Sequence, residues 1–330
     1  MNRNSKNCID VVIPVHDGEK FILDALNSAE NQTLPPEKII VVDDGSVDKT
    51  YGLVSEYAKS AKVKIEIIKK ANGGLSSARN AGIRASKAEF IAFLDADDTW
   101  TINKLEKQIK IFKNTAFSNL ALVYCNYDVI DTIGVKLYEN YKVPLDPKRM
   151  RGKVFKKLLE RNQIASSGSG ALVKRSVFDS VGLFDENLKF GEDWDMWLRI
   201  AEKFEVDFAP EILAHIRKHA GNMTASSIKT FGNELEFYKK WLGKIEGKHP
   251  APLFWSDKIT FRILFGRSHK EALKLVKNKL TEKFYKILFR KTLGNFWLYV
   301  PFFFLRQILN LAIYPKYLPI IWKYVRYGGK

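Results

Sequence analysis

A short apolar run that leads directly into three carboxylates is the feature that most limits how this chain can fold. Residues 90–94 read FIAFL, and Asp95, Asp97 and Asp98 follow at once. A continuous apolar run of this length predicts a strand that is buried on both faces of a mainly parallel sheet. Open α/β sheets bind their ligands at the carboxyl ends of such strands, where these acids would lie. We therefore expect an α/β fold whose ligand site includes the acids.

Closely spaced carboxylates repel one another, and a bound divalent cation is a common way to offset that repulsion. Mg²⁺ is usually held by one or two carboxylates together with phosphate oxygens of a substrate, which suits the D-x-D pair Asp95 and Asp97. The plainer alternative is an acidic turn that caps the next helix. The buried strand in front of the pair favours the metal site. The sequence assigns no role to Asp98.

The segments before the acids alternate between strand and helix patterns. Short apolar strands are predicted at 8–15, 38–42 and 63–68, and helical spacing follows each of them, the last helix covering 76–85. This alternation predicts a doubly wound, mainly parallel sheet with flanking helices. Neither a G-x-G-x-x-G turn after the first strand nor a G-x-x-x-x-G-K-[ST] loop is present. A dinucleotide dehydrogenase and a P-loop NTPase are therefore disfavoured.

A second acidic cluster, GEDWDMW at 191–197, reads as the first turn of a half-buried helix. Acids at a helix N-terminus are favoured by the helix dipole alone, which is the simpler explanation. Adjacent carboxylates can also separate their pKa values and leave one of them ready for proton transfer. Further on, the alternation of 213–219 places His215, Arg217 and His219 on one side of a strand.

Three ordered motifs carry a family resemblance: VVIPVHDGEKFILDALNSAENQT at 11–33, VVDDGSVDKT at 41–50 and NGGLSSARNAGIRASKAEFIAFLDADD at 72–98. Together they resemble the nucleotide-binding half of family 2 glycosyltransferases of the GT-A fold, in particular inverting D-x-D enzymes of bacterial surface glycans. The resemblance covers about residues 10–222. It implies a GT-A domain at 1–225, with a nucleotide-binding half at 1–100 and an acceptor-side half at 101–225.

The resemblance implies a set of donor-binding residues. Pro14 and His16 would lie against the nucleobase, Asp44 would bond to it, Arg79 would lie near the nucleotide, and Asp95 near the ribose or the metal. Elementary chemistry is compatible with these roles. A carboxylate can accept from a uracil N–H, and reading a base edge by hydrogen bonds discriminates strongly. A guanidinium offers a planar fork for phosphate or carboxylate, although a surface arginine on a helix is an equal alternative by position alone.

The resemblance also implies a metal site and an acceptor side. Asp97 would bind Mg²⁺ or Mn²⁺, with Asp95 as a neighbour, and His219 would lie by the metal or the donor diphosphate. In the second cluster, Asp193 would be the general base, with Glu192 and Trp194 on the acceptor side.

These expectations combine into one predicted function and two alternatives. The chain would transfer a sugar, with inversion and metal assistance, from a UDP-sugar to a lipid-linked or polymeric glycan. One alternative is a nucleotidyltransferase of similar fold, but the basic Gly-rich signature expected near its first strand is missing. The other is a catalytically idle glycan-binding or scaffolding relative, against which the intact acids argue.

The last part of the chain differs in composition from the rest. Residues 251–330 hold 16 Lys and Arg against 3 Asp and Glu, so most of the net charge of +17 belongs to this segment. The uncharged run 293–305 is too short to span a bilayer, for which about 20 residues are needed. Basic residues mixed with Trp, Phe and Leu are typical of helices that lie in the membrane interface. We therefore expect 226–330 to be a helical extension that binds anionic membrane surfaces.

A hydrophobic dimer interface and a helical subdomain with a solvated basic face are the alternatives for this extension, so an oligomer stays open. Nucleic-acid binding is disfavoured because no recognition motif accompanies the charge. The two cysteines, Cys8 and Cys125, have no metal-ligand spacing and indicate reduced thiols. The first 15 residues contain no apolar segment long enough for a signal peptide. We expect a cytoplasmic protein, peripheral on the inner face of the cell membrane.

Overall fold

The computed structural model describes residues 8–138, 150–164, 168–222 and 227–245. The chain divides into two compact units, Met1–Ala225 and Ser226–Lys330. In the second unit the described element is the helix α8, Ser227–Ile245, which lies at the start of the segment expected to be helical from the sequence. The basic, aromatic-rich segment 251–330 lies outside the described residues. No helix in the described ranges combines the length and the apolar character needed to cross a bilayer.

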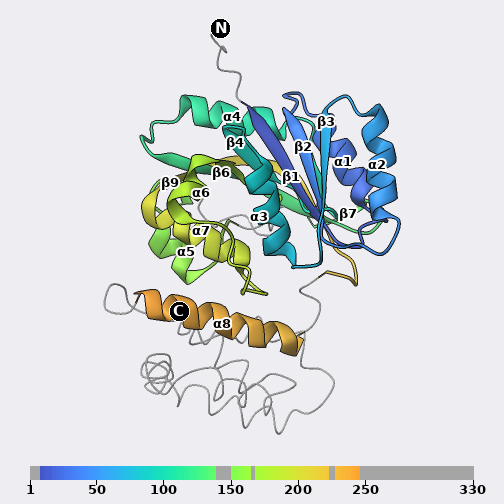
Figure 1. Ribbon diagram of the computed structural model, residues 1–330. Coiled ribbons are helices and arrows are strands. Elements are labelled where there is room, and N and C mark those ends of the chain that lie inside the picture. The colour runs from blue at the N-terminus through green and yellow to red at the C-terminus, as the bar shows by residue number, and fades with distance from the viewer. Residues whose placement is uncertain (1–7, 139–149, 165–167, 223–226, 246–330) are drawn as a thin grey trace. The chain divides into compact units, whose positions relative to one another are not determined.

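The first half of unit 1 alternates strictly between strand and helix, as the sequence predicts. Its elements are β1 Ile9–Val15, α1 Ile22–Glu30, β2 Lys38–Asp43, α2 Thr50–Ser60, β3 Lys64–Lys69, α3 Leu75–Ala85 and β4 Phe90–Phe93. The strands pair in parallel in the order β3-β2-β1-β4. Crossovers between parallel strands are right-handed, so the reversal of direction after β3 places α3 on the face opposite to α1 and α2 (Figure 1).

The second half of unit 1 extends the same sheet with strands of both directions. Its elements are β5 Thr99–Trp100, α4 Lys104–Asn114, β6 Leu120–Ile130, β7 Lys136–Tyr138, α5 Phe155–Glu160, β8 Leu172–Lys174, α6 Ser176–Val181, α7 Glu192–Lys203 and β9 Glu205–Arg217. The sheet order is β3-β2-β1-β4-β8-β6-β9-β5, with β7 paired to β6. β8 is antiparallel to both β4 and β6, whereas β6 and β9 are parallel. The sheet is therefore parallel in its first half and mixed in its second.

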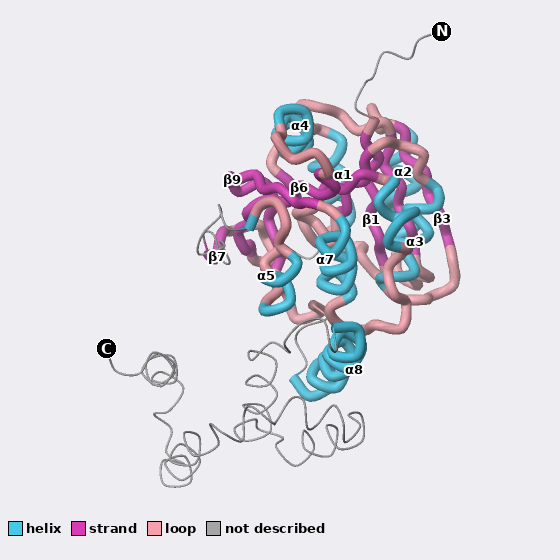
Figure 2. Tube along the Cα trace, turned by 90° about the vertical axis from the view of Figure 1, so that its left-hand side faces the viewer, coloured by secondary structure: helices cyan, strands magenta, loops and turns pink. Residues whose placement is uncertain are grey.

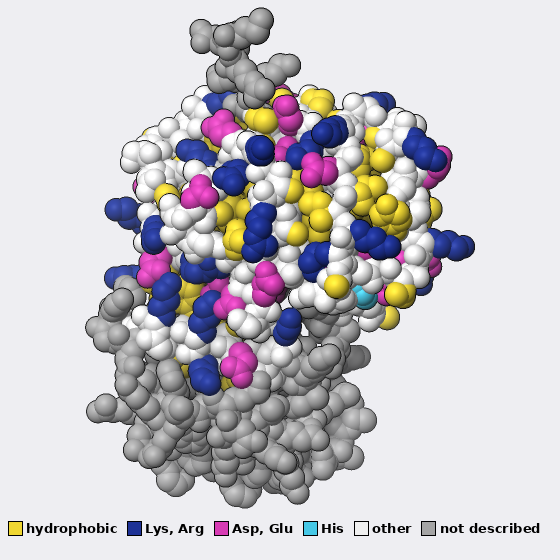
Figure 3. Space-filling model, viewed as in Figure 1, with side chains coloured by type: hydrophobic (Ala, Val, Ile, Leu, Met, Phe, Trp, Pro, Cys, Tyr) yellow, Lys and Arg dark blue, Asp and Glu magenta, His cyan; other side chains and the backbone are white. Residues whose placement is uncertain are grey.

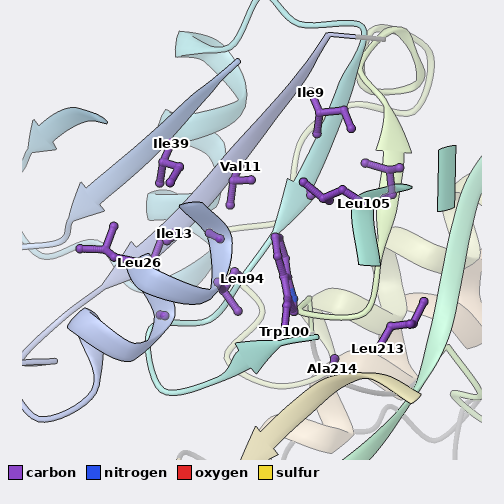
Figure 4. Packing of buried hydrophobic residues seen from close by; sticks show 14 of the residues in the cluster. Ile9, Val11, Ile13, Leu26, Ile39, Leu94, Trp100, Leu105, Leu213 and Ala214 are labelled. Atoms are coloured by element: carbon purple, nitrogen blue, oxygen red, sulfur yellow. The ribbon is translucent and has the colours of Figure 1, made fainter. Parts of the chain in front are cut away.

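The core on the α1 side of the sheet joins the two halves. Figure 4 shows Trp100 between Leu94, which follows β4, and Leu105 of α4, with Val11 of β1 close by. All four side chains are buried. The indole N–H of Trp100 donates to the carbonyl of Ser169 at 2.7 Å. The segment after β4 is thus anchored by apolar packing and a buried hydrogen bond, which fixes the position of the acids that precede Trp100.

Helix α7 is held against its neighbours through its first turns. Figure 2 shows α5 and α7 next to each other, and the indole N–H of Trp194 in α7 donates to the carbonyl of Leu158 in α5 at 2.7 Å. Trp194 is only 5% exposed, and Trp197 is fully buried. These contacts place the acidic first turn of α7 where it can meet the end of β4.

Charge on the surface of the described residues is mixed in sign. On the face shown in Figure 3, Lys and Arg side chains lie among Asp and Glu side chains. This mixture agrees with the sequence, in which the excess of positive charge belongs to the last 80 residues.

Candidate active site

Asp98, to which the sequence assigned no role, shapes the loop that carries the other two acids. Its carboxylate accepts from Ser169 Oγ at 2.6 Å and from the backbone N–H of Arg217 at 2.9 Å. The side chain is buried, and burial, followed by the charges of Asp97 and Asp95, raises its pKa well above the usual range. Asp98 therefore ties the end of β4 to the end of β9 and to the segment before β8.

Arg217 fastens the same loop from the side of β9. Its Nε donates to the carbonyl of Asp97 at 2.9 Å, and its Nη2 donates to Asp24 Oδ2 of α1 at 2.9 Å. The guanidinium also lies over the ring of Phe21, 4.8 Å from the ring centroid. At 4% exposure, Arg217 is a buried clamp for the D-x-D loop.

Asp97 and His219 lie together, as the sequence predicts. His219 Nε2 is 2.9 Å from Asp97 Oδ2, and the side-chain amide of Asn222 donates to the same oxygen at 3.1 Å. His219 Nδ1 accepts from the backbone N–H of Gly221, so in the neutral ring the proton lies on Nε2 and faces Asp97. Burial, followed by the charge of Asp95, raises the pKa of Asp97.

Asp97 and His219 are the predicted ligands of a metal ion. In the described part of the chain, no three His, Cys, Asp or Glu side chains group closely enough to form a cation site of their own. Asp97, with Asp95 near it, instead suits a cation that takes most of its ligands from substrate phosphates and water, and His219 could join it only by giving up its bond to Asp97 or to Gly221. The residues fit Mg²⁺ or Mn²⁺ in that manner, and the metal stays a prediction.

Asp44, the predicted partner of the nucleobase, organises the loop that leads into α3. Its carboxylate accepts from the backbone N–H groups of Gly73 at 3.0 Å and Gly74 at 2.7 Å, and it also pairs with Lys70. Gly74 has φ +88°, a conformation that favours glycine at this turn. A contact of Asp44 with a base would have to be made in addition to these bonds.

His16 and Pro14 stand at the carboxyl end of β1, as the sequence predicts. Pro14 lies inside the buried strand, whereas the imidazole of His16 is 45% exposed. The loop around His16 is bonded to the loop after β2: the backbone N–H groups of Asp17, Gly18 and Glu19 donate to Ser46 Oγ, Thr50 Oγ1 and Asp48 Oδ2. The two loops therefore form one cross-linked edge next to the exposed imidazole.

Asp193, the predicted base, lies in the first turn of α7, in the second acidic cluster of the site. Helix α7 starts after Gly191, whose φ of 69° is left-handed. Asp193 Oδ1 accepts from the backbone N–H of Trp194 at 2.6 Å, and the amide of Asn162 lies 3.4 Å from Oδ2. Burial and the neighbouring charge of Glu192 raise the pKa of Asp193 to about 7, although the charge of Arg79 opposes the rise. A carboxyl group with this pKa can take a proton near neutral pH.

Arg79 joins the two acidic clusters. It is fully buried, its Nη2 donates to Asp95 Oδ1 at 2.8 Å, and its Nη1 donates to Glu192 Oε1 at 3.0 Å. The nearby carboxylates raise its pKa even though burial opposes a charge. Its immediate partners are thus protein carboxylates, and the predicted contact with a nucleotide stays a prediction.

The sequence named Trp194 as a site residue, but it did not find Asn222, Ser169 or Asn162. Trp194, expected on the acceptor side, packs α7 against α5 through its buried indole. Asn222 follows His219 closely, and Ser169 lies in the small-residue stretch SSGSG, so both had a local signal. Asn162 beside Asp193 had none, because it comes from a different segment, after α5.

The sequence is similar to those of known glycosyltransferases. The model described as Glycosyl transferase family 2 matches residues 10–182. An uncharacterized glycosyltransferase of Rickettsia prowazekii is 32% identical over 84% of this chain and 87% of its own length. The chain belongs to glycosyl transferase family 2. A second uncharacterized glycosyltransferase, from Rickettsia typhi, is 34% identical over 71% of this chain and 70% of its own length.

Solved structures support the fold of this family member. Staphylococcus aureus TarS 1–349 in complex with UDP-GlcNAc has a TM-score of 0.59 at 17% identity, over 86% of this chain and 79% of TarS 1–349. TarS 1–349 in complex with UDP has a TM-score of 0.56, also at 17% identity, over 84% and 76% of the two chains. The predicted α/β fold of the GT-A type is confirmed.

Proposed function

We propose that this family 2 glycosyltransferase moves a sugar from a UDP-sugar to a glycan acceptor with inversion, and that Asp193 is its general base. The observation that carries the proposal is the position of Asp193. Its carboxyl group has a pKa of about 7 and lies next to Glu192, which Arg79 connects to Asp95 at the end of β4. A proton acceptor and the acids of the D-x-D loop are thereby brought to one site.

The donor is proposed to lie at the carboxyl ends of β1, β2 and β4. His16 is exposed there, Asp44 follows β2, and Asp95 and Asp97 follow β4. TarS, a structural neighbour, is described in complex with UDP and with UDP-GlcNAc, which supports a uridine nucleotide as the donor. The sugar itself is left to experiment.

The proposed reaction is a single displacement. The acceptor hydroxyl gives its proton to Asp193 while its oxygen forms a bond to the anomeric carbon. The bond from that carbon to the UDP oxygen breaks on the opposite side, and UDP leaves with the electron pair. Mg²⁺ or Mn²⁺ at Asp97, with His219 and Asp95 beside it, would neutralise charge on the diphosphate. No side chain needs to form a covalent bond to the sugar.

The proposed acceptor is a lipid-linked or polymeric glycan at the inner face of the cell membrane. The support comes from composition, because 251–330 is strongly basic and rich in aromatic residues. This segment lies outside the described residues.

The proposal is tested by UDP release from a panel of UDP-sugars, with and without Mn²⁺ and Mg²⁺. Asp97→Asn keeps the shape of the side chain and removes its charge, so metal-dependent release should be lost while the fold is retained. Asp193→Asn should lower kcat by about 100-fold or more with UDP affinity unchanged, since a positioned base contributes about 10² to 10⁴.

Three outcomes would contradict the proposal. Full activity of Asp97→Asn with either metal would remove Asp97 from the metal site. Loss of donor affinity with an unchanged kcat in Asp193→Asn would make Asp193 a binding residue. Release of pyrophosphate from a nucleoside triphosphate, without turnover of any UDP-sugar, would favour a nucleotidyltransferase.

A further inference from the structure

Arg79 of α3 is a buried cation at the meeting point of two acidic segments that are far apart in the sequence. Its two terminal nitrogens contact Asp95 after β4, at 2.8 Å, and Glu192 at the start of α7, at 3.0 Å. Asp193, the proposed base, interacts electrostatically with the same guanidinium. One side chain therefore connects the donor-side acid to the turn that carries the base.

The guanidinium also packs against Phe184 and Gly168. The ring of Phe184 lies 5.4 Å from its central carbon. On Gly168, a Cβ atom would come within 3.2 Å of Arg79 Nη2 and within 3.1 Å of Phe93 Cβ, so the backbone of Gly168 packs closely against the fork. Arg79 consequently has little freedom to rotate toward another partner.

Burial makes this arrangement depend on both carboxylates. A charged group without contact with water is stable only when it is paired and hydrogen-bonded, and removing one partner leaves an uncompensated charge. Arg79 has no exposed surface, so a phosphate group could contact it only after a neighbouring group is displaced, and among the described residues Asp95 and Glu192 hold its two terminal nitrogens.

We propose that Arg79 is a positioning residue that fixes the first turn of α7 relative to the D-x-D loop by holding Glu192 and Asp95 together, and that it is not a phosphate ligand. This inference rests on the proposed function, because its effect on catalysis requires Asp193 to be the base. A displacement of about 1 Å at the reacting groups can lower a rate by about 10²-fold. Loss of the bridge should therefore lower kcat more than it lowers donor affinity.

Two substitutions show whether Arg79 acts through its two hydrogen-bonded contacts or only through its positive charge. Arg79→Met keeps much of the volume and removes both bonds. Arg79→Lys keeps the charge, but a single ammonium group lacks the planar fork that holds two carboxylates. For both variants we expect kcat for UDP release to fall by about 10- to 100-fold, while the Kd for UDP with Mg²⁺ changes by less than about threefold. Arg84→Met, at an exposed position of the same helix, is the matched control and should change neither quantity.

The phosphate-ligand alternative gives the opposite pattern. In that case Arg79→Met would weaken UDP binding by tenfold or more and Arg79→Lys would restore it, which would overturn the inference. UDP binding by calorimetry is measured independently of turnover. If wild-type protein binds UDP but releases none from any donor, the proposed function fails, and strong loss of UDP binding in Arg79→Met would still refute the positioning role.

A double-mutant cycle with Glu192→Gln guards against simple loss of folding. Glu192→Gln removes one carboxylate that Arg79 holds, so the Arg79→Met/Glu192→Gln protein has fewer unpaired buried charges than Arg79→Met alone. If the two residues act as one bridge, the double variant should lose no more kcat, and unfold at no lower temperature, than the worse single variant. Additive losses in both measurements would show independent roles and would overturn the inference.

Discussion

Asp193 shows how a single residue can combine a proposed catalytic property with a disadvantage for folding. Burial and Glu192 raise its pKa to about 7. The folded protein therefore binds a proton at this site more tightly than the unfolded chain does. The contribution of Asp193 to the free energy of unfolding therefore falls as the pH rises from the pKa of this group in the unfolded chain toward 7. Above pH 7 the carboxylate is ionised in the folded protein, and the full cost of burying its charge is present. Function and stability thus make opposite demands on this carboxyl group.

A pH profile tests this property directly. A general base acts when it is deprotonated, so we expect kcat for UDP release to rise about tenfold per pH unit below pH 7 and to level off above it. Asp193→Asn should abolish this dependence. The same variant should unfold at a higher temperature than wild type at pH 8, with a smaller difference at pH 5. A wild-type profile that is flat between pH 5 and pH 8 would contradict the assignment of Asp193.

Lys104 at the start of α4 is a second buried ionisable residue, outside the proposed site. Its Nζ donates to Gln108 Oε1 at 2.8 Å and lies 4.1 Å from the centroid of the Trp100 ring. Burial lowers its pKa to about 8. The unfolded chain keeps this proton up to the ordinary lysine pKa, so the protein should gain stability as the pH rises from 8 toward 10.5.

We therefore expect Lys104→Met to remove a pH dependence rather than only to shift stability. Between pH 7 and pH 9.5 wild type should gain about 2 kcal/mol of unfolding free energy relative to Lys104→Met. Denaturant unfolding at the two pH values measures this difference. Lys113→Met, at an exposed position of the same helix, is the control and should show no such change. Equal pH dependence in wild type and Lys104→Met would mean that Lys104 ionises normally.

The sequence predicted which acids meet at the site better than it predicted what each acid does. The family resemblance placed both Asp97 and His219 by the metal, and the two side chains are in contact, although their metal role stays a prediction. The sequence did not show that Asp98 ties the D-x-D loop to Ser169 and Arg217, or that Arg79 bridges Asp95 and Glu192. Both depend on partners, Ser169 and Glu192, that only the folded chain brings near.

At the scale of elements, the structure follows from apolar runs that are long enough to be distinctive. β1, β2 and β4 are buried at nearly every position, so their sequences are predominantly apolar and were predicted within one or two residues. β5 and β8 have two and three residues, too few for any periodicity, and were missed. Their pairing is set by neighbouring strands, which also explains why the antiparallel part of the sheet was not foreseen.

The close approach of α3 to β1 gives a test of element packing. A Cβ on Gly82 of α3 would lie 2.3 Å from Val12 Cγ1 in β1, so the helix could not keep its position. We expect Gly82→Ala to destabilise the protein by about 1 to 3 kcal/mol, measured by denaturant unfolding. Gly52→Ala in α2 is the matched control, because nothing lies within 4 Å of its Cβ. That variant should be stabilised by about 0.5 to 1 kcal/mol.

The unfolding free energies of the two glycine variants, compared with each other, show whether α3 packs rigidly against β1. Two equal stabilities would mean that α3 can shift away from β1 at no cost. Because α3 also carries Arg79, a displaced helix should change the proposed site as well. Gly82→Ala is therefore expected to lower kcat for UDP release in addition to stability, whereas Gly52→Ala should leave kcat unchanged.

At the scale of the whole molecule, the described residues and the basic segment differ in their physical character. Unit 1 carries charges of both signs on the face shown in Figure 3, whereas 251–330 has 16 basic residues and only 3 acidic ones. Electrostatic attraction to anionic lipids acts over a Debye length of about 8 Å at physiological salt. Each basic residue near the surface contributes about 1 kcal/mol. We propose on this ground that the last segment brings the site of unit 1 to a membrane-bound acceptor.

Removal of the residues after Leu293 tests this proposal. The truncated protein should no longer sediment with anionic liposomes, and transfer to lipid-linked acceptors should fall. Slow hydrolysis of the UDP-sugar by water should persist, because the residues proposed for donor chemistry all precede Asn222. Sedimentation of full-length protein should weaken as salt is raised, since the attraction is screened. Undiminished sedimentation of the truncated protein would contradict the proposal, and aggregation or loss of folding would instead favour a dimer interface or a structural core in this segment.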